Sequence, residues 1–189
     1  MTDPARDPAE DGPVPHGRAP NGSAPESPVP EGSATPGPVA GGANGAAPDD
    51  LAWLRLACDL AKRCPPSRTA FSVGAVIVDA DGREIARGFS REHDPHDHAE
   101  EAALARAAGD LTGATVYSSL EPCGHRASRP RPCAELIAAS GVRRVVFAWR
   151  EPALFTEGAG AEILAAAGVE VTEIPELADR AREPNAHLL

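Results

Sequence analysis

The chain has 189 residues, a formal net charge of −10 at pH 7 and an isoelectric point of about 5.0. This acidic balance is not typical of proteins that bind nucleic acid, which present clustered lysine and arginine to the phosphates. No apolar run approaches the length of about 18 residues that a membrane helix needs, and the N-terminus has acids and prolines instead of an export signal. We therefore expect a cytoplasmic protein with no nucleic-acid or membrane partner.

Residues 1–49 differ sharply in composition from the rest of the chain. The first 50 residues hold 11 of the 20 prolines and 8 of the 18 glycines, and they contain no Leu, Ile, Phe, Trp or Tyr. A segment with so little apolar surface cannot offset the entropy that ordering would cost. We predict a disordered acidic tail over residues 1–49 and one folded domain over residues 50–189, which is long enough for a single core.

The first half of this domain predicts two helices around a hairpin. Apolar residues recur at helical spacing up to Cys64, and Asp49 and Asp50 precede them as expected helix caps. A β-branched apolar run, a turn containing Gly82 and a second such run predict paired strands. The expected elements are a helix over residues 51–64, strands over 71–78 and 84–89, and a helix over 98–108.

The second half alternates strands and helices. The expected elements are strands over residues 114–119, 143–148 and 169–173, and helices over 132–141, 158–167 and 175–182. This order predicts an α/β fold in three layers, with a five-stranded mixed sheet flanked by helices.

Three reactive side chains stand at the ends of predicted elements. His98 and Cys133 each begin a helix, and Cys123 follows a strand directly. Imidazole and thiolate are preferred ligands of Zn²⁺, and a catalytic zinc site uses three protein ligands. The positive dipole end of each helix would also favour thiolates there. We therefore predict a zinc ion bound by His98, Cys123 and Cys133.

Glu100 stands two residues after His98, within the first turn of the same helix. A carboxylate at this place can reach both water at the metal and a leaving amine. His-x-Glu followed by Pro-Cys and a second Cys is the signature of zinc deaminases. We expect hydrolytic deamination in which Glu100 moves protons as the general acid and base.

The other cysteines and nearby histidines have no spacing that indicates a metal. With no export signal, free thiols or metal ligands are expected in place of disulfides. Cys58 lies on the apolar face of the first helix and is expected in the core, whereas Cys64 has no defined partner. His93 and His96 are expected in a solvated loop.

Two further features narrow the comparison with known families. Cys123 and Cys133 enclose nine residues, and the run Ser119–Cys123 reads Ser-Leu-Glu-Pro-Cys. With the run Val145–Pro152, these features make residues 51–171 resemble the cytidine-deaminase superfamily, and within it the pyrimidine deaminases of riboflavin biosynthesis. The resemblance implies a three-layer cytidine-deaminase-like fold and a zinc cofactor.

The riboflavin branch acts on a diaminopyrimidinone that carries a ribosyl phosphate, so the resemblance implies a small phosphorylated pyrimidine as substrate. It implies substrate contacts by four residues: Ala99, Pro122, His125 and Arg126. Arg126, Arg129 and Arg131 stand in one loop, and three arginines so placed suit a single phosphate better than a nucleic-acid strand.

The chain departs from the bacterial riboflavin deaminases at two places. Those enzymes carry Pro-Asn-Pro where this chain has Thr69–Phe71, and a second histidine where it has Ala102. The run Ala70–Gly74 is more similar to the fungal form. The reductase domain that follows many bacterial deaminases is not recognised in this sequence, so the resemblance implies a separate reductase and, in addition, a homo-oligomer.

Two alternatives stay open. A deoxycytidylate or cytidine deaminase is one of them, because Ala70 and Ala102 remove two features of the riboflavin-type pocket. The other is a structural zinc module or a non-catalytic binding protein, in which a fourth protein ligand closes the site. His125 is the candidate for that fourth ligand.

Overall fold

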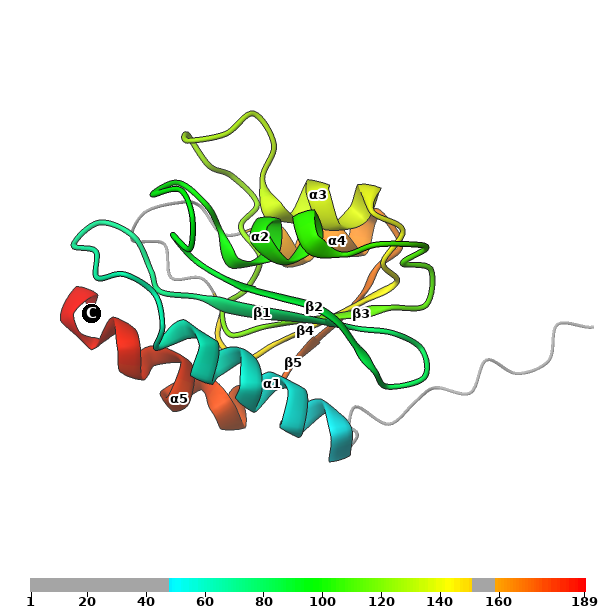
Figure 1. Ribbon diagram of the computed structural model, residues 1–189, viewed down its shortest axis with the longest axis horizontal. Helices are drawn as coiled ribbons and strands as arrows, with labels where there is room; N and C mark the ends of the chain where they lie inside the picture. The colour runs from blue at the N-terminus through cyan, green and yellow to red at the C-terminus, as the bar shows by residue number, and fades with distance from the viewer. Residues whose placement is uncertain (1–47, 151–158) are drawn as a thin grey trace, which may run out of the picture. The chain divides into compact units, whose positions relative to one another are not determined.

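The computed structural model describes residues 48–150 and 159–189, all of which belong to one unit, Gly42–Leu189 (Figure 1). Most of the expected tail lies outside these residues, and its disorder stays a prediction. Pro48 and Asp49 are described, and they start helix α1 (Pro48–Ala61), which therefore begins three residues before the predicted position.

Five strands form one mixed sheet in the order β2-β1-β3-β4-β5. Strand β1 pairs antiparallel with both β2 and β3, whereas β3, β4 and β5 run parallel. Every residue of β1 is buried, as its uninterrupted apolar sequence requires of a central strand. The strands are β1 (Gly74–Val78), β2 (Glu84–Phe89), β3 (Thr115–Ser118), β4 (Arg144–Phe147) and β5 (Glu170–Glu173).

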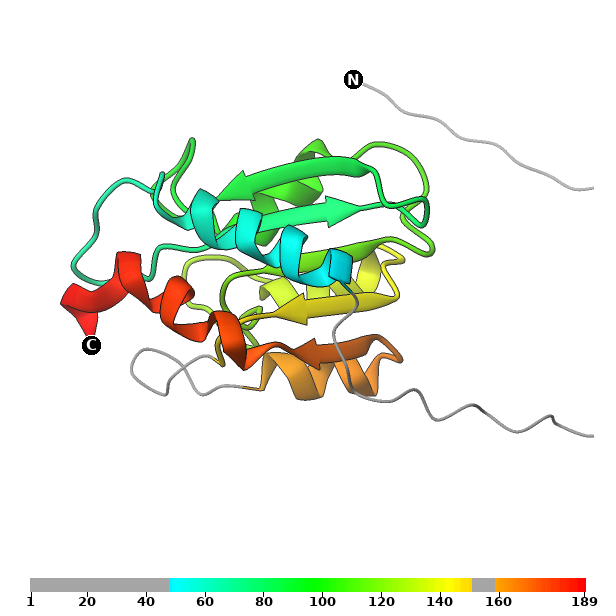
Figure 2. The same cartoon turned by 90° about the horizontal axis from the view of Figure 1, so that it is seen from below.

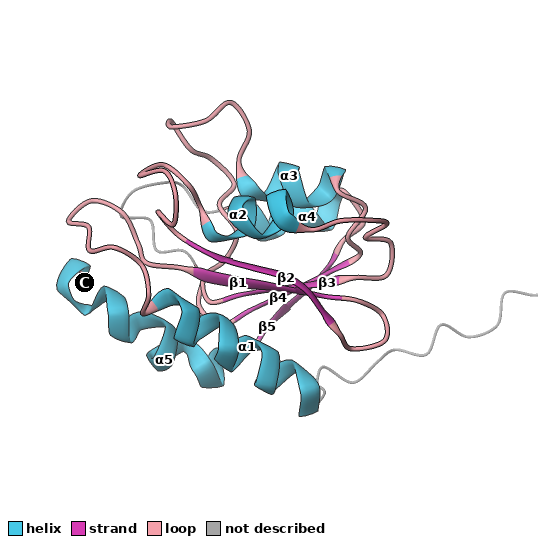
Figure 3. Cartoon of the chain, viewed as in Figure 1, coloured by secondary structure: helices cyan, strands magenta, loops and turns pink. Residues whose placement is uncertain are grey.

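Helices cover both faces of the sheet, so the predicted three-layer α/β fold with a five-stranded mixed sheet is confirmed (Figures 1 and 3). Helices α2, α3 and α4 lie on one face, and α1 and α5 lie on the other, where Figure 2 shows them in front of the strands. The remaining elements are α2 (Ala99–Arg106), α3 (Cys133–Ala139), α4 (Gly160–Ala166), α5 (Ala178–Arg182) and the 3₁₀ turns η1 (Pro175–Leu177) and η2 (Glu183–Leu188). None of the helices in the described part of the chain is long and apolar enough to cross a bilayer.

Asp49 and Asp50 lie inside the first turn of α1 and do not precede it, so neither is its N-cap residue, which corrects the prediction. The buried carboxylate of Asp50 accepts hydrogen bonds from Tyr117 Oη at 2.8 Å and from two guanidinium nitrogens of Arg144 at 2.7 and 2.9 Å. A carboxylate buried between a helix and a sheet needs such partners, because its desolvation would otherwise cost several kcal/mol. Asp50 therefore ties α1 to strands β3 and β4.

The chain between α1 and β1 is irregular where the sequence predicted regular structure. Helix α1 ends at Ala61, and Arg63 and Cys64 continue in turns before Pro65, which disfavours helix in the residue before it. The predicted strand begins at Gly74, not at Phe71. The main chain of Ser72 bonds instead with the side chain of Asn185, far along the sequence.

Candidate active site

The three candidate ligands come from three elements that meet at the carboxyl end of β3. His98 is the N-cap residue of α2, Cys123 follows β3 in the loop 119–123, and Cys133 is the first residue of α3. Sites in open α/β sheets typically form at this end of the strands, where the loops diverge. The ends of the elements therefore bring together residues that lie up to 35 positions apart.

The geometry of this group fits zinc. Nδ1 of His98 lies 3.5 Å from the Sγ atoms of both Cys123 and Cys133, and all three ligand atoms lie within 4.8 Å of one another. Tetrahedral zinc, with Zn–N of about 2.0 Å and Zn–S of about 2.3 Å, places nitrogen and sulfur about 3.5 Å apart. One imidazole and two thiols at this spacing match the donor set of a zinc site with three protein ligands.

Main-chain hydrogen bonds hold the two cysteines together. Cys133 N donates to Cys123 Sγ at 3.3 Å, and Ala134 N donates to the carbonyl oxygen of Cys123 at 3.1 Å. The hydrogen bond from the Cys133 side chain, aided by His98, lowers the pKa of Cys123, against the opposing effect of burial. A lowered pKa favours the thiolate, which is the form that binds metal.

The start of α4 supports the loop that carries Cys123. A Cβ atom at Gly160 would lie 1.7 Å from the carbonyl oxygen of Pro122, so only glycine permits this approach. The buried carboxylate of Glu121 accepts a hydrogen bond from Ala161 N at 2.9 Å, and Glu121 N donates to the carbonyl of Trp149 at 2.8 Å. The ligand loop is therefore fixed between β4 and α4.

Glu100 lies beside the ligand group and is buried. It is 3 % exposed, and its Oε1 accepts a hydrogen bond of 2.7 Å from Ser118 Oγ, at the end of β3. Burial raises the pKa of Glu100, while His98 and the bond from Ser118 oppose that rise. A carboxyl group with a raised pKa is suited to accept and return a proton near neutral pH.

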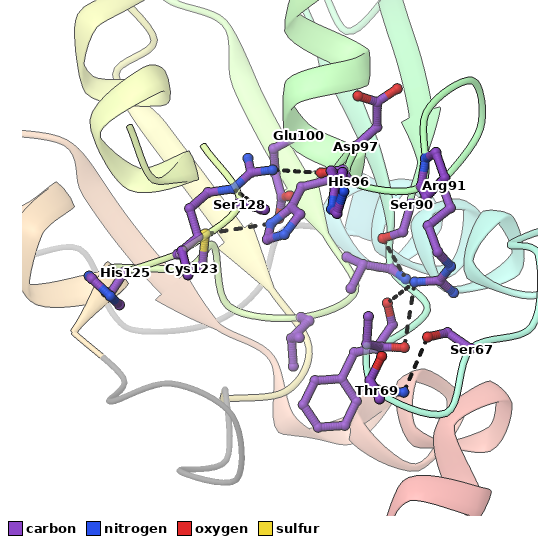
Figure 4. A pocket seen from close by; sticks show the side chains of 18 of the residues that line it. Ser67, Thr69, Ser90, Arg91, His96, Asp97, Glu100, Cys123, His125 and Ser128 are labelled. Atoms are coloured by element: carbon purple, nitrogen blue, oxygen red, sulfur yellow. Dashed lines mark hydrogen bonds between the residues drawn. The ribbon is translucent and has the colours of Figure 1, made fainter. Parts of the chain in front are cut away.

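Glu100 opens into a cavity of about 570 Å³, within the usual range for small-molecule sites (Figure 4). His98, Glu100 and Cys123 line one side of it, and residues between α1 and β1 line another. Figure 4 shows Thr69 and Arg91 on the side away from Cys123. The cavity is much larger than one pyrimidine ring, so it leaves room for a substituent on the ring.

The four predicted substrate contacts are placed differently from one another. His125 is exposed and lines the cavity, and Arg126 also lines it. Ala99 and Pro122 are fully buried and are not among the lining residues. Their roles remain predictions.

The loop arginines have carboxylate partners. The Arg126 side chain is 3 % exposed and donates to Glu101 Oε2 at 3.0 Å and to the carbonyl of His96 at 2.6 Å. Arg129 donates to Asp97 Oδ1 at 3.0 Å. These ion pairs hold the loop against the start of α2. They also neutralise arginine charges that the sequence alone had suggested for binding a phosphate.

The remaining cysteines are free, as expected. Cys58 is fully buried in the core, and burial raises its pKa to about 12, which confirms its predicted place. Cys64 Sγ donates to the carbonyl of Val73 at 3.3 Å. His93 and His96 are exposed, as predicted for a solvated loop.

His125 is not part of the metal-binding group found among the described residues, which contains only His98, Cys123 and Cys133. The alternative of a closed structural site, which needs His125 as a fourth ligand, is therefore not supported.

Only one of the two departures from the bacterial pattern concerns the cavity. Ala70 lines it, whereas Ala102 is buried and faces β2, where a Cβ at Gly88 would lie 2.9 Å from that of Ala102. Ala102 is therefore not among the residues that line the cavity, because this face of α2 packs on the sheet.

Sequence reasoning missed Ser118, Arg91 and Asn185. The sequence did contain one indication for Ser118. Side chains alternate between the two faces of a sheet along β3, and this alternation could have placed Ser118 on the face that α2 covers. Arg91 has φ of 61°, a left-handed conformation that is uncommon outside glycine, and its sequence gives no warning of this. Asn185 acts across 113 positions, beyond any local pattern.

Residues 48–149 match the sequence profile described as the cytidine and deoxycytidylate deaminase zinc-binding region. The chain belongs to this family. The match includes all three candidate ligands and Glu100, and the family's zinc-binding character agrees with the geometry of the site. The predicted superfamily and zinc cofactor are thereby confirmed.

Relatives within the family point to its riboflavin branch. Diaminohydroxyphosphoribosylamino-pyrimidine deaminase of Schizosaccharomyces pombe is 38% identical over 126 residues, which cover 64% of this chain and 31% of that protein. Riboflavin biosynthesis protein RibD of Aquifex aeolicus is 39% identical over 140 residues, covering 72% of this chain and 37% of that protein. The chain thus spans only about a third of the length of these relatives.

Solved structures agree with this placement. RibD of Acinetobacter baumannii, in its form 2, matches with a TM-score of 0.66 and 38% identity over 75% of this chain and 39% of that one. A deletion mutant of Aspergillus oryzae Rib2 deaminase in complex with DARIPP matches with a TM-score of 0.57 over 74% of this chain and 98% of that one. Its identity of 24% supports the fold alone.

Proposed function

We propose that the protein is a zinc-dependent hydrolytic deaminase, and that its substrate is the diaminopyrimidinone ribosyl phosphate of riboflavin biosynthesis. The observation that carries this proposal is the group of His98, Cys123 and Cys133 at zinc spacing, with buried Glu100 opening into the same cavity. The similarity to a pyrimidine deaminase and to RibD supports the substrate.

His98, Cys123 and Cys133 would hold the metal through Nδ1 and the two Sγ atoms. Zinc, when bound, supplies the Lewis acidity that makes water a competent nucleophile near neutral pH. The remaining chemistry belongs to Glu100. Oε1 of Glu100 accepts the hydrogen bond from Ser118, so Oε2 is the oxygen that exchanges protons with the reactants.

Glu100 takes one proton from water as a carbon–oxygen bond forms at the amino-bearing ring carbon, and it passes this proton to the ring nitrogen. It then moves the second water proton from the new hydroxyl group to the amine, and the carbon–nitrogen bond breaks to give ammonia and a ring carbonyl. Burial favours the first half of this exchange, because the raised pKa of Glu100 stabilises the protonated form that follows it.

The cavity supports a substrate larger than a bare ring. Its volume of about 570 Å³ exceeds what a pyrimidine fills, and Phe71 and Leu120 offer apolar contacts to the ring system. His125 is exposed on the lining, which supports its role as a predicted substrate contact. Arg126 remains a proposed substrate contact, but it can reach the substrate only if its ion pair with Glu101 rearranges.

A deoxycytidylate or cytidine deaminase is the second candidate, and one observation favours it. Ala70 lines the cavity where the bacterial riboflavin deaminases carry the asparagine of Pro-Asn-Pro, so an amide that could bind the ring is missing. A dCMP deaminase of the cyanophage S-TIM5 has the same fold, with a TM-score of 0.53 at 23% identity, which does not bear on the substrate.

The test is ammonia release by the zinc-loaded protein with three compounds: the diaminopyrimidinone ribosyl phosphate, dCMP and cytidine. We expect kcat/KM for the first to exceed that for the others by at least about 100-fold, the size of discrimination that a missing polar contact can produce. Preference for dCMP or cytidine would transfer the proposal to the second candidate. No release from any of them by protein that contains zinc would overturn the deaminase proposal.

The proposal also includes two partners. One Thermotoga maritima relative is described as both the deaminase and 5-amino-6-(5-phosphoribosylamino)uracil reductase, so a reductase is the enzyme class that would consume the product here. A homo-oligomer is also proposed, and sedimentation at several protein concentrations tests it.

A further inference from the structure

We propose that Arg91 and Asn185 are positioning residues that hold residues 65–73, here named the wall segment, in the shape that fits the substrate. The wall segment forms one side of the cavity. This inference rests on the proposed function for the role of the cavity as a substrate site. The contacts that hold its wall do not depend on that function.

The wall segment contains no helix and no strand. It lines the cavity through six residues: Pro66, Ser67, Thr69, Ala70, Phe71 and Val73. A segment without regular structure must satisfy its main-chain polar groups from elsewhere, and those partners decide its shape. Two side chains from outside the segment supply partners for four of these groups, which are the carbonyls of Pro65 and Phe71 and both main-chain groups of Ser72.

Arg91 joins the two ends of the wall segment. Its Nε and one terminal nitrogen donate to the carbonyl of Pro65 at 3.0 and 2.8 Å, and its other terminal nitrogen donates to the carbonyl of Phe71 at 2.8 Å. The guanidinium also donates to Ser72 Oγ at 2.9 Å. Among the described residues no carboxylate pairs with Arg91, and its planar set of donors is directed to the wall segment.

Asn185 holds the same segment from the C-terminal turn η2. Its Oδ1 accepts from Ser72 N at 2.7 Å and its Nδ2 donates to the carbonyl of Ser72 at 3.0 Å, so both main-chain groups of Ser72 are satisfied by one side chain. A third bond, from Nδ2 to the carbonyl of Ala181 at 3.2 Å, fixes the amide in its own turn. Asn185 is 1 % exposed, so water cannot replace it without opening the structure.

Arg91 and Asn185 therefore meet at Ser72, one through its hydroxyl and the other through its main chain. Phe71, which precedes Ser72, packs edge-on against Trp149 with 5.3 Å between ring centroids. Loss of either clamp would free the wall and widen the cavity. Glu100 and the candidate ligands would stay in place, because β3, α2 and α3 hold them independently.

The expected signature is a rise in KM with little change in kcat. Each clamp contributes hydrogen bonds worth about 1 kcal/mol net, so Arg91→Ala and Asn185→Ala should each raise KM by about five- to tenfold. Arg91→Lys keeps the charge but cannot span Pro65 and Phe71, so it should resemble Arg91→Ala. Zinc content should stay at the wild-type level in all three. Arg143→Ala, which removes an exposed arginine elsewhere, is the matched control.

Hydrogen exchange of the zinc-loaded full chain supplies a measurement that does not depend on turnover. Amides in residues 65–73 should exchange at least tenfold faster in each clamp variant, with those of β1 and β3 unchanged and with Arg143→Ala like wild type. The double variant should raise KM by less than the product of the two single effects, because both residues act on one segment.

Unchanged exchange in the wall segment, wild-type behaviour of Arg91→Lys, or a multiplicative double variant would each overturn the proposal. If Asn185→Ala does not fold, the two Arg91 variants decide it. If the wild-type protein releases no ammonia from the riboflavin intermediate, the proposed substrate is wrong. Hydrogen exchange in residues 65–73 still tests the roles of Arg91 and Asn185 in that case. The KM values are then compared with whichever pyrimidine the protein does turn over.

Discussion

Replacement of Glu100 by Gln removes one buried carboxylate and keeps the size of the side chain. The amide oxygen of Gln can still accept the bond that Ser118 Oγ donates to Oε1 at 2.7 Å. Burial raises the pKa of Glu100 and so favours its neutral, protonated form. A neutral amide should therefore be tolerated at this position. We expect zinc content to be unchanged and the melting temperature to stay within about 3 °C, which is less than about 1 kcal/mol for a domain of this size.

The loss of turnover should be large. General acid–base catalysis contributes about 10²–10⁴-fold, and Glu100 would act in several successive transfers. The other carboxylates that line the cavity have partners of their own, since Asp97 accepts from Arg129 and Glu121 accepts from Ala161 N. Neither is placed to substitute, so we expect a fall in kcat of about 10⁴-fold, at the upper end of that range.

The assay combines ammonia release, zinc analysis and thermal unfolding. Glu135→Gln is the matched control, because Glu135 stands two residues after Cys133, as Glu100 stands two after His98, yet is exposed on α3. Its kcat should stay within about twofold of wild type, as is usual for an exposed position.

Two results would refute this reasoning. Loss of zinc together with activity would make Glu100 a ligand or a structural support. Full turnover with zinc retained would place the proton transfer on another group, and Glu101 and Glu121 would be the next residues to test.

Three further predictions test the surroundings of the site. Cys133→Ser should lose zinc, because serine lacks the soft thiolate, and full metal occupancy in that variant would contradict the ligand assignment. Ser118→Ala should lower kcat by about tenfold or more at constant zinc, since a hydrogen bond to a charged group is worth about 1.5–3 kcal/mol, and a change confined to KM would disagree. Gly160→Ala should displace the Pro122 carbonyl, lower stability by at least about 1–3 kcal/mol and weaken zinc binding, whereas Gly168→Ala, with no atom within 4 Å, should keep the zinc.

Local pattern in the sequence was sufficient for the elements and for the chemistry of the metal group. Helical spacing and β-branched runs follow from how single helices and strands bury one face, so the order of elements and the mixed sheet were predictable. His98, Cys123 and Cys133 were predictable as a group because each stands at the end of an element, and the ends of these elements converge.

The tertiary structure decided which charged and polar groups are available. Arg126 looked free for a phosphate, yet Glu101 and the carbonyl of His96, more than 20 positions away, take up its donors. The sequence predicted Asp50 as a helix cap, yet Arg144, 94 positions away, donates hydrogen bonds to its carboxylate. A buried charge must find a partner, and the sequence does not show which one lies beside it.

The same limit applies to the wall of the cavity. Residues 71–73 have the composition of a strand, and propensity alone predicts a strand there. Asn185 takes the main-chain groups of Ser72 across 113 positions, so the sheet begins only at Gly74. The sequence by itself thus determined the reactive groups and the elements that carry them, whereas only the packing of the chain determined the shape of the cavity, because that shape depends on hydrogen bonds between residues that no local pattern connects.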